Sequence, residues 1–519
     1  NNLAKGNLVQ QLLLAGDRSN PLPYSSIVTS YTYEPLYNQF KRIEGPGKAV
    51  TELDYDYFTK GAEGNPIVRR HPARTTAAGE TLSPIETTYE YTSTGLLLQE
   101  TDPLHHKTVY AHSPAGYLLS VSDEGDPQDN ASFGRDIRGN MTKFTDARGT
   151  VTTLKVDQRD LVREKIEDDS EKGFKNRTTY QYDENGNLVQ EQITVQDNFP
   201  GNEAFAGVPK QSFQLTKTYQ YNLVNLQVSE TQTAGALSRT RTQAYDAEGN
   251  LASVQEPEGF TIAYHYDRLG NVARKTFGGK LAETYRYNLN GNLVEQKRGG
   301  SSTTAYEPDP FDRPYKRVMP EGTIILTPLN PDGTTQKIDV QGKNHESKPV
   351  RLRLIEFQYD EIGDKIETKE HIVGPDGFAA GLRTERLVRD AEGKVLTLID
   401  ARKNHSTFKY TGHRKDSDTD PLLNEVRYAY EPGGLPTSIT EIEREVTFRE
   451  KDGQPKREEA TRHFVKTMTY DALGRLSSFS VPGGSSAKLA YDSQGNLRAK
   501  VEHSGRMDVF EFDGFGRGV

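Results

Sequence analysis

The chain has 519 residues, a formal net charge of −9 at pH 7, no cysteine and only 33% apolar residues. These values exclude disulfides, thiolate metal sites and a cysteine nucleophile. The dispersed Lys and Arg residues leave no basic patch for nucleic acid, and no apolar run of about 18 residues would allow membrane insertion. A chain this polar can be disordered, but its 27 Tyr, 20 Phe and regularly spaced turns favour a thin sheet with much surface per residue.

The chain begins with a lead-in segment, residues 1–30, that lacks a clean copy of the pattern found later. Its apolar stretch Leu8–Leu14 fits either a strand or a short helix. The repeat region is predicted to span residues 31–519 and to be truncated at its C-terminus, because Phe512–Arg517 opens a further copy without completing it. Because the chain starts with Asn1 and ends inside a repeat, we expect it to be a piece of a longer polypeptide.

A short pattern, aromatic–Asp/Asn–x–x–Gly–Asn–aliphatic, recurs along the repeat region. It begins at Tyr245, Tyr266 and Tyr287, and each step is 21 residues. A fixed period of this size indicates stacked copies of one small unit. The predicted repeat-turn residues are Tyr182, Asp183, Gly186, Tyr245, Asp246, Gly249, Tyr266, Asp267, Gly270, Tyr287, Gly291, Tyr470, Asp471, Gly474, Tyr491, Asp492 and Gly495.

Each copy predicts a β-hairpin. The Asp side chain accepts hydrogen bonds from the backbone just downstream, and the Gly three residues later adopts positive φ without steric cost. This combination fits a type I turn closed by a glycine bulge. Tyr245 and Leu251 are then expected to pair across the hairpin, and Tyr182, Tyr266, Tyr287, Tyr470 and Tyr491 have equivalent aliphatic partners.

Variants of the pattern fill the rest of the chain. Thr92 replaces the Asp in one copy, and Arg389 replaces the aromatic residue in another. A second kind of turn, as at Asp146–Thr150, is predicted to link one unit to the next. Two longer hairpins are expected, one around Gly374–Gly377 and one from Val446 to Phe464, and no amphipathic helix longer than about two turns is predicted.

The Tyr-Asp-x-x-Gly-Asn-Leu units, with Asp/Glu-Pro-x-Gly-x-Thr-x-x-Tyr between them, resemble the YD repeats of the bacterial Rhs family. The B and C components of Tc toxins and animal teneurins share these repeats, and the resemblance covers roughly residues 30–517. It implies an all-β fold, a long spiralling antiparallel sheet of hairpins that forms a hollow shell or part of one. In the bacterial relatives such a shell encloses a C-terminal toxin or effector segment.

The resemblance carries over no catalytic residue. The Asp-Pro-x-Gly-Leu-type motif and the aspartate self-cleavage site of an Rhs core are not found in this sequence. The absence of the Cys-rich modules of teneurins favours a bacterial source, and the resemblance implies a secreted or cell-surface location.

No catalytic, cofactor or metal site is predicted. The repeated aspartates, which also include Asp360, Asp390 and Asp513, occupy turn positions where Asp is expected for backbone reasons. Asp416–Asp420 begins like a calcium loop, but Pro421 and Arg427 replace the Gly and Glu that such a loop requires, so a solvated loop is expected instead. Adjacent His105 and His106 would point to opposite faces of a strand, which is unfavourable for holding one metal ion.

Two functions remain open from the sequence. The first is a non-catalytic shell that encapsulates a toxin or effector segment, with that segment or a further Rhs-shell chain as partner. The alternative is a cell-surface adhesin whose tyrosines contact glycans or partner cells. Exposed aromatic residues clustered on one outer face would favour the adhesin.

Overall fold

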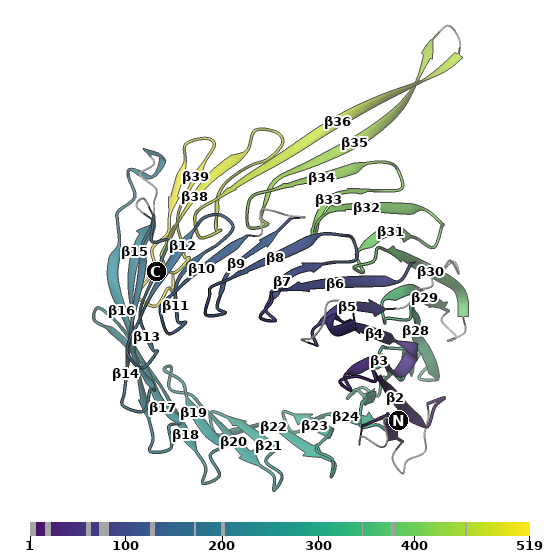
Figure 1. The fold of residues 1–519 in the computed structure, drawn as a ribbon, viewed down its shortest axis with the longest axis horizontal. Coiled ribbons are helices and arrows are strands. Elements are labelled where there is room, and N and C mark those ends of the chain that lie inside the picture. The colour runs from purple at the N-terminus through teal and green to yellow at the C-terminus, as the bar shows by residue number, and fades with distance from the viewer. Residues whose placement is uncertain are drawn as a thin grey trace. The chain divides into compact units, whose positions relative to one another are not determined.

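The computed structural model describes residues 7–15, 22–58, 64–71, 83–124, 130–170, 173–198, 203–344, 346–374, 377, 379–451 and 454–518. This part of the chain contains forty strands (Figure 1), and its helical structure is limited to the short 3₁₀ turns Pro46–Lys48, Asp56–Phe58 and Glu203–Phe205. The predicted all-β class of antiparallel hairpins is therefore confirmed. No described helix is long and apolar enough to cross a membrane.

The chain divides into two compact units. Unit 1 comprises residues 1–107 and 262–407, and unit 2 comprises residues 108–261 and 408–519. Each unit therefore combines two runs of sequence that are far apart along the chain.

Unit 1 contains two runs of strands that pair antiparallel in chain order, β1 to β7 and β20 to β32, of which β32 continues into unit 2 from residue 408. The first run is β1 (Gln10–Leu14), β2 (Ser26–Tyr33), β3 (Phe40–Glu44), β4 (Val50–Tyr55), β5 (Pro66–His71), β6 (Ile85–Tyr91) and β7 (Leu97–Thr101). The second run is β20 (Thr261–Tyr266), β21 (Val272–Phe277), β22 (Lys280–Tyr287), β23 (Leu293–Arg298), β24 (Ser302–Pro308), β25 (Pro314–Val318), β26 (Ile324–Leu326), β27 (Lys337–Lys343), β28 (Pro349–Tyr359), β29 (Lys365–Val373), β30 (Ala379–Arg389), β31 (Val395–Ile399) and β32 (His405–Thr411).

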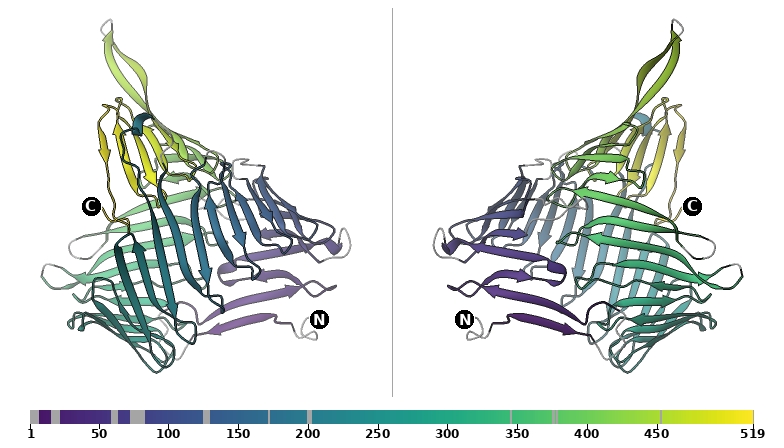
Figure 2. Two further views of the ribbon diagram at one scale, coloured as in Figure 1. Left: turned by 90° about the vertical axis from the view of Figure 1, so that its left-hand side faces the viewer. Right: turned by 90° about the vertical axis from the view of Figure 1, so that its right-hand side faces the viewer.

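Unit 2 is built in the same way from β8 to β19 and β33 to β40 (Figure 2). The first run is β8 (Lys107–His112), β9 (Leu118–Asp123), β10 (Ala131–Arg135), β11 (Met141–Thr145), β12 (Val151–Val156), β13 (Val162–Glu167), β14 (Asn176–Tyr182), β15 (Leu188–Asn198), β16 (Ser212–Tyr221), β17 (Gln227–Ala234), β18 (Leu237–Tyr245) and β19 (Leu251–Gln255). The second run is β33 (Arg414–Thr419), β34 (Glu425–Tyr430), β35 (Pro436–Lys451), β36 (Gln454–Tyr470), β37 (Leu476–Ser480), β38 (Ser486–Asp492), β39 (Leu497–Glu502) and β40 (Met507–Val509).

The repeat turn has one hydrogen-bond pattern, which the copy at Tyr245 illustrates. Tyr245 pairs with Leu251, and the strand register shifts by one residue just before Tyr245. The Asp246 N–H donates to the Asn250 carbonyl at 2.9 Å, and the Gly249 N–H donates to the Asp246 carbonyl at 3.2 Å. Gly249 has φ of 87°, so the turn is the type I turn with a glycine bulge that the sequence predicts.

The turns between hairpins use the same two hydrogen bonds but lack the register shift, so the predicted second kind of turn is distinct in its strand pairing. The Gly149 N–H donates to the Asp146 carbonyl at 2.9 Å, and the Asp146 N–H donates to the Thr150 carbonyl at 3.1 Å. Phe144 pairs with Thr152 and Thr145 with Val151 without a shift, so hairpin turns and linking turns share the turn hydrogen bonds but differ in the register of the strands that they join.

The structure also tests the predictions made for the Leu8–Leu14 stretch and for the two longer hairpins. The Leu8–Leu14 stretch, which fitted a strand or a helix, contains strand β1. Both longer hairpins are present as β29–β30 and β35–β36, and the second of these is the long arm of unit 2 in Figure 1. Residues 375 and 376 of the first tip and 452 and 453 of the second lie outside the described residues.

Side-chain burial fits a single layer of strands. On β18 the side chains of Arg239, Arg241, Gln243 and Tyr245 are half-buried, and the residues between them are exposed. Buried apolar groups form only small clusters, such as Val195, Leu215 and Ala234. Among the described residues, the largest fully buried side chains include the polar residues Arg498, Glu34 and Asp309. The low apolar content therefore reflects a sheet that has little interior of its own.

In unit 1, the segment before β2 contacts the turn between β24 and β25. Tyr24 stacks on Phe311 with ring centroids 5.6 Å apart, and its hydroxyl donates to the Leu329 carbonyl. Arg313 donates to the Tyr24 hydroxyl and, through Nε, to the buried Asp309 carboxylate at 2.9 Å. These contacts join the two runs of strands within unit 1.

In unit 2, β15 pairs with β38 through Asp197 with Asp492 and Asn198 with Tyr491. Next to this pairing, Arg498 Nε donates to the Asp197 carboxylate at 2.9 Å, and both side chains are at most 2% exposed. The Arg498 guanidinium also donates to the Pro209 carbonyl at 3.2 Å. A buried, hydrogen-bonded ion pair thus joins the two runs of unit 2.

Replacing Gly270 tests the backbone requirement of the turn. Gly270 has φ of 81°, and a Cβ added there would meet nothing within 4 Å. Gly270→Val is therefore expected to lower the free energy of unfolding by about 1–3 kcal/mol through backbone strain alone, as measured by urea titration.

Gly270→Asn is the matched control, because Asn tolerates positive φ. Asn225 already occupies the equivalent turn position with φ of 61°. Equal stability of the Val, Asn and Gly proteins would contradict the turn assignment.

Candidate functional site

The tyrosine of each repeat ties its hairpin to the preceding one. The Tyr287 hydroxyl donates to the Val272 carbonyl at 3.1 Å, and Val272 is the residue paired with Tyr266. The Tyr491 hydroxyl donates in the same way to the Leu476 carbonyl at 2.8 Å. Leu476 is paired with the tyrosine of the copy before, Tyr470. The aromatic position therefore provides a hydrogen bond between successive copies.

This hydroxyl-to-carbonyl bond recurs in both units. Further examples are Tyr55 to Phe40, Tyr91 to Pro66, Tyr182 to Val162, Tyr221 to Leu188, Tyr245 to Gln227, Tyr359 to Thr335 and Tyr470 to Pro436. Each such bond contributes about 0.5–1.5 kcal/mol in general, so the series stabilises the sheet along its whole length.

Arg389, which replaces the aromatic residue in its copy, makes the same bond. Its Nε donates at 3.2 Å to the carbonyl of Lys365, the residue paired with Tyr359. Arg135 donates likewise to the Leu118 carbonyl at 2.9 Å. The sequence does not predict this hydrogen bond, because the pattern shows which residue is aromatic but not which backbone carbonyl its hydroxyl contacts.

The turn aspartates act as hydrogen-bond acceptors. Asp267 Oδ1 accepts from the backbone N–H groups of Leu269 at 2.8 Å and Asn271 at 2.9 Å. These bonds, with that from the Asn271 backbone foremost, hold the pKa of Asp267 below its usual value. The Asn187 side chain is the main cause of the lowered pKa of Asp183. Carboxylates held ionised in this way are poor general acids.

The predicted repeat residues lie at separate turns. Tyr182 with Asp183 and Gly186, and Tyr245 with Asp246 and Gly249, close β14–β15 and β18–β19. The other copies occupy equivalent positions, with Tyr266 paired to Val272, Tyr287 to Leu293, Tyr470 to Leu476 and Tyr491 to Leu497. The corresponding glycines Gly270, Gly291, Gly474 and Gly495 all have positive φ. The turns therefore form a repeated structural element rather than one converging site.

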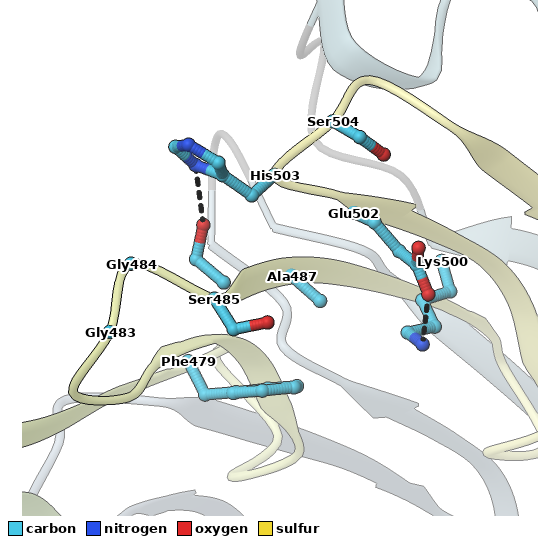
Figure 3. Close-up of a pocket in the computed structure, with 10 residues that line it drawn as sticks. Phe479, Gly483, Gly484, Ser485, Ala487, Lys500, Glu502, His503 and Ser504 are labelled. Carbon is cyan, nitrogen blue, oxygen red and sulfur yellow. Dashed lines mark hydrogen bonds and ion pairs between the residues drawn. The ribbon is translucent and has the colours of Figure 1, made fainter.

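A shallow polar cavity of about 380 Å³ lies against the turn between β37 and β38 (Figure 3). His503 Nδ1 is 3.5 Å from the Ser486 hydroxyl, and Lys500 Nζ forms an ion pair with Glu502 at 2.8 Å. The Lys500 ammonium is the main cause that lowers the pKa of Glu502. Glu502 is therefore committed to Lys500, and this cavity lacks the His-orienting carboxylate of a nucleophilic triad.

Two expectations about the acidic and histidine motifs are wrong in structural detail. Asp416 and Asp418 lie on strand β33 rather than in a solvated loop, and Asp418 accepts from Lys415 at 2.5 Å and Tyr428 at 3.0 Å. His105 and His106 lie in a turn rather than on a strand, because the His105 N–H closes the turn onto the Asp102 carbonyl at 3.0 Å. His105 takes the positive-φ position at 69°.

Comparison with known proteins supports the repeat assignment. Residues 245–280 match the family described as RHS Repeat, and the predicted relationship to the Rhs/YD-repeat family is confirmed. No curated protein matches the chain significantly.

Solved structures share the fold at low sequence identity. A crystal structure of TcdB2-TccC3-TEV aligns with a TM-score of 0.57 and 12% identity, over 95% of this chain and 30% of that chain. A structure of the Photorhabdus luminescens Tc holotoxin pore aligns with a TM-score of 0.57 and 12% identity, over 92% of this chain and 27% of that one. The chain thus spans less than a third of the length of these structures, and the likeness establishes the fold alone.

Removing one tyrosine hydroxyl tests the bond between hairpins. Tyr287→Phe leaves the Val272 carbonyl without this donor, so the free energy of unfolding is expected to fall by about 0.5–1.5 kcal/mol. Urea titration of the purified chain measures the change.

Tyr264→Phe is the matched control, because the described residues offer its hydroxyl no hydrogen-bond partner and it lies on β20, which β21 separates from the Tyr287 strand β22. A stability loss of equal size in both variants would show that the Tyr287 hydroxyl has no special role.

Proposed function

We propose that this chain is part of the wall of an Rhs-type shell that encloses a toxin or effector segment of a bacterial protein. The observation that carries the proposal is the hydroxyl-to-carbonyl bond repeated between successive hairpins. Such bonds let a single layer of strands continue from copy to copy without a thick hydrophobic core. The shared fold with the TcdB2-TccC3 structures supports the same function.

The chemistry of the sheet suits enclosure of a polypeptide. The half-buried face of β18 carries arginine, glutamine and tyrosine side chains instead of an aliphatic stripe. A polar surface gives an enclosed chain little apolar area on which to fold or aggregate. We infer that the wall is non-catalytic, because its repeated carboxylates are engaged in turn hydrogen bonds.

The glycan-binding adhesin receives no specific support from the described side chains. The exposed aromatic residues are Tyr37, Phe40, Tyr117, Phe277 and Phe510, and of these Tyr37 and Phe40 alone share a hairpin, β2–β3. Carbohydrate recognition by stacking needs aromatic rings grouped on one face, so we do not develop this alternative. We propose secretion or surface delivery because the proposed function is similar to that of the Tc toxin components.

Limited proteolysis of the complete polypeptide that contains this chain tests the proposal. A segment enclosed by the wall is expected to resist a nonspecific protease under native conditions and to be digested once the wall is unfolded in urea. Electron microscopy of the same sample is expected to show density inside a thin-walled particle.

The control uses the same segment expressed without the wall, which is expected to be digested at once. Rapid digestion of the segment in the native polypeptide, or a solid particle built of compact lobes, would overturn the encapsulation proposal.

A further inference from the structure

A mixed cluster of one imidazole and two carboxylates lies in unit 1, where two turns distant in sequence meet. Asp102 and His106 belong to the turn after β7, and Glu392 belongs to the turn between β30 and β31. One ligand atom from each residue lies within 4.8 Å of the other two. The three side chains are 20%, 27% and 12% exposed, respectively, so the cluster is mostly withdrawn from solvent.

The spacing of these atoms suits one small ion. His106 Nδ1 is 2.9 Å from Asp102 Oδ2 and 4.0 Å from Glu392 Oε1. Tetrahedral Zn²⁺ with bonds of about 2.0–2.2 Å to nitrogen and oxygen separates its ligand atoms by roughly 3.4 Å. The two observed distances bracket this value, and the remaining pair of ligand atoms, from Asp102 and Glu392, lies within 4.8 Å, so small side-chain shifts would bring the three atoms around one ion.

The turn holds one of these ligands in place. Asp102 Oδ1 accepts from the backbone N–H groups of Leu104 and His106, both at 2.8 Å, which leaves Oδ2 directed at the imidazole. Hydrogen bonds to the other oxygen of a ligating carboxylate are typical of support around metal ligands. Glu392 comes from another hairpin, and one of its carboxylate oxygens lies within 4.8 Å of the ligand atoms of Asp102 and His106.

We propose that Asp102, His106 and Glu392 form a binding site for a divalent transition-metal ion of the Zn²⁺ class, which fastens the two runs of unit 1 to each other. One imidazole with two carboxylates is a ligand set that favours Zn²⁺ or Mn²⁺ over Ca²⁺, which takes six to eight oxygens. On binding, the ion takes the place of the direct contact between His106 Nδ1 and Asp102 Oδ2. The proposal does not depend on what the shell encloses.

Lys394 is the built-in competitor of such an ion. Its ammonium group contacts Glu392 Oε2, the oxygen opposite the one that faces His106. A cation held there reduces the attraction of the cluster for a metal ion. Either Lys394 or a metal ion can neutralise the carboxylates of the cluster. If the site binds a metal ion, removing Lys394 removes a competing cation, and the affinity for the ion is expected to rise.

Thermal unfolding of the chelator-treated chain, with and without ZnCl₂, tests the site, and Mg²⁺ at the same concentration serves as the comparison ion. At free Zn²⁺ about 100-fold above the dissociation constant, the ratio of folded to unfolded protein is expected to rise about 100-fold. His106→Asn is expected to abolish this rise. His105→Asn is the matched control and should keep it, because His105 is exposed and outside the cluster.

Lys394→Gln provides a second readout that does not require loss of a ligand. Titration calorimetry is expected to show that this variant binds Zn²⁺ more tightly than the unaltered chain does. One ion per chain is expected to bind at this site. Equal Zn²⁺ responses of the His105 and His106 variants would overturn the site. Unchanged or weaker Zn²⁺ binding in Lys394→Gln would also overturn it.

Discussion

The hydrogen bond from a tyrosine hydroxyl to a backbone carbonyl of the preceding hairpin is the interaction on which the sheet depends. A lone two-stranded hairpin is marginally stable in water, and these hairpins bury few apolar side chains. The hydroxyl reaches the residue that is paired with the preceding tyrosine, as Tyr491 reaches Leu476. Each copy therefore positions the next, and the hydrogen bonds between successive hairpins recur with the sequence repeat.

The turn chemistry explains why a polar chain can be this regular. The Asp side chain satisfies backbone donors that would otherwise face water, and the positive-φ residue ends the turn at a fixed length. Where glycine is absent, other residues accept the same backbone strain, such as Leu423 at φ of 67° and Lys403 at 66°. The turn thus keeps a positive φ at this position even where the sequence does not place a glycine there.

The sequence predicted the hairpins because their determinants are local. The pairing of Tyr245 with Leu251 follows from residues within a single copy. The acceptor of the tyrosine hydroxyl lies in another copy, and the same bond from Arg389 shows that the pattern itself does not encode it. Contacts between distant runs were not predictable either. Arg498 and Asp197 are 301 residues apart, and neither belongs to a motif that marks it as half of a buried pair.

The candidate metal cluster was missed for a related reason. Treating His105 and His106 as strand residues placed them on opposite faces, whereas the turn exposes His105 and directs His106 toward Asp102. The third member, Glu392, comes from a turn 290 residues after Asp102 (392 − 102). Only the meeting of two turns within unit 1 brings these side chains together.

Hydrogen exchange of the Tyr491→Phe chain, read by mass spectrometry, tests the central claim most directly. If the hydroxyl bond joins successive hairpins, amide exchange should accelerate in both β38–β39 and the preceding hairpin β36–β37, and remain unchanged in β33–β34. Faster exchange confined to β38–β39, or no change in either hairpin, would contradict the account.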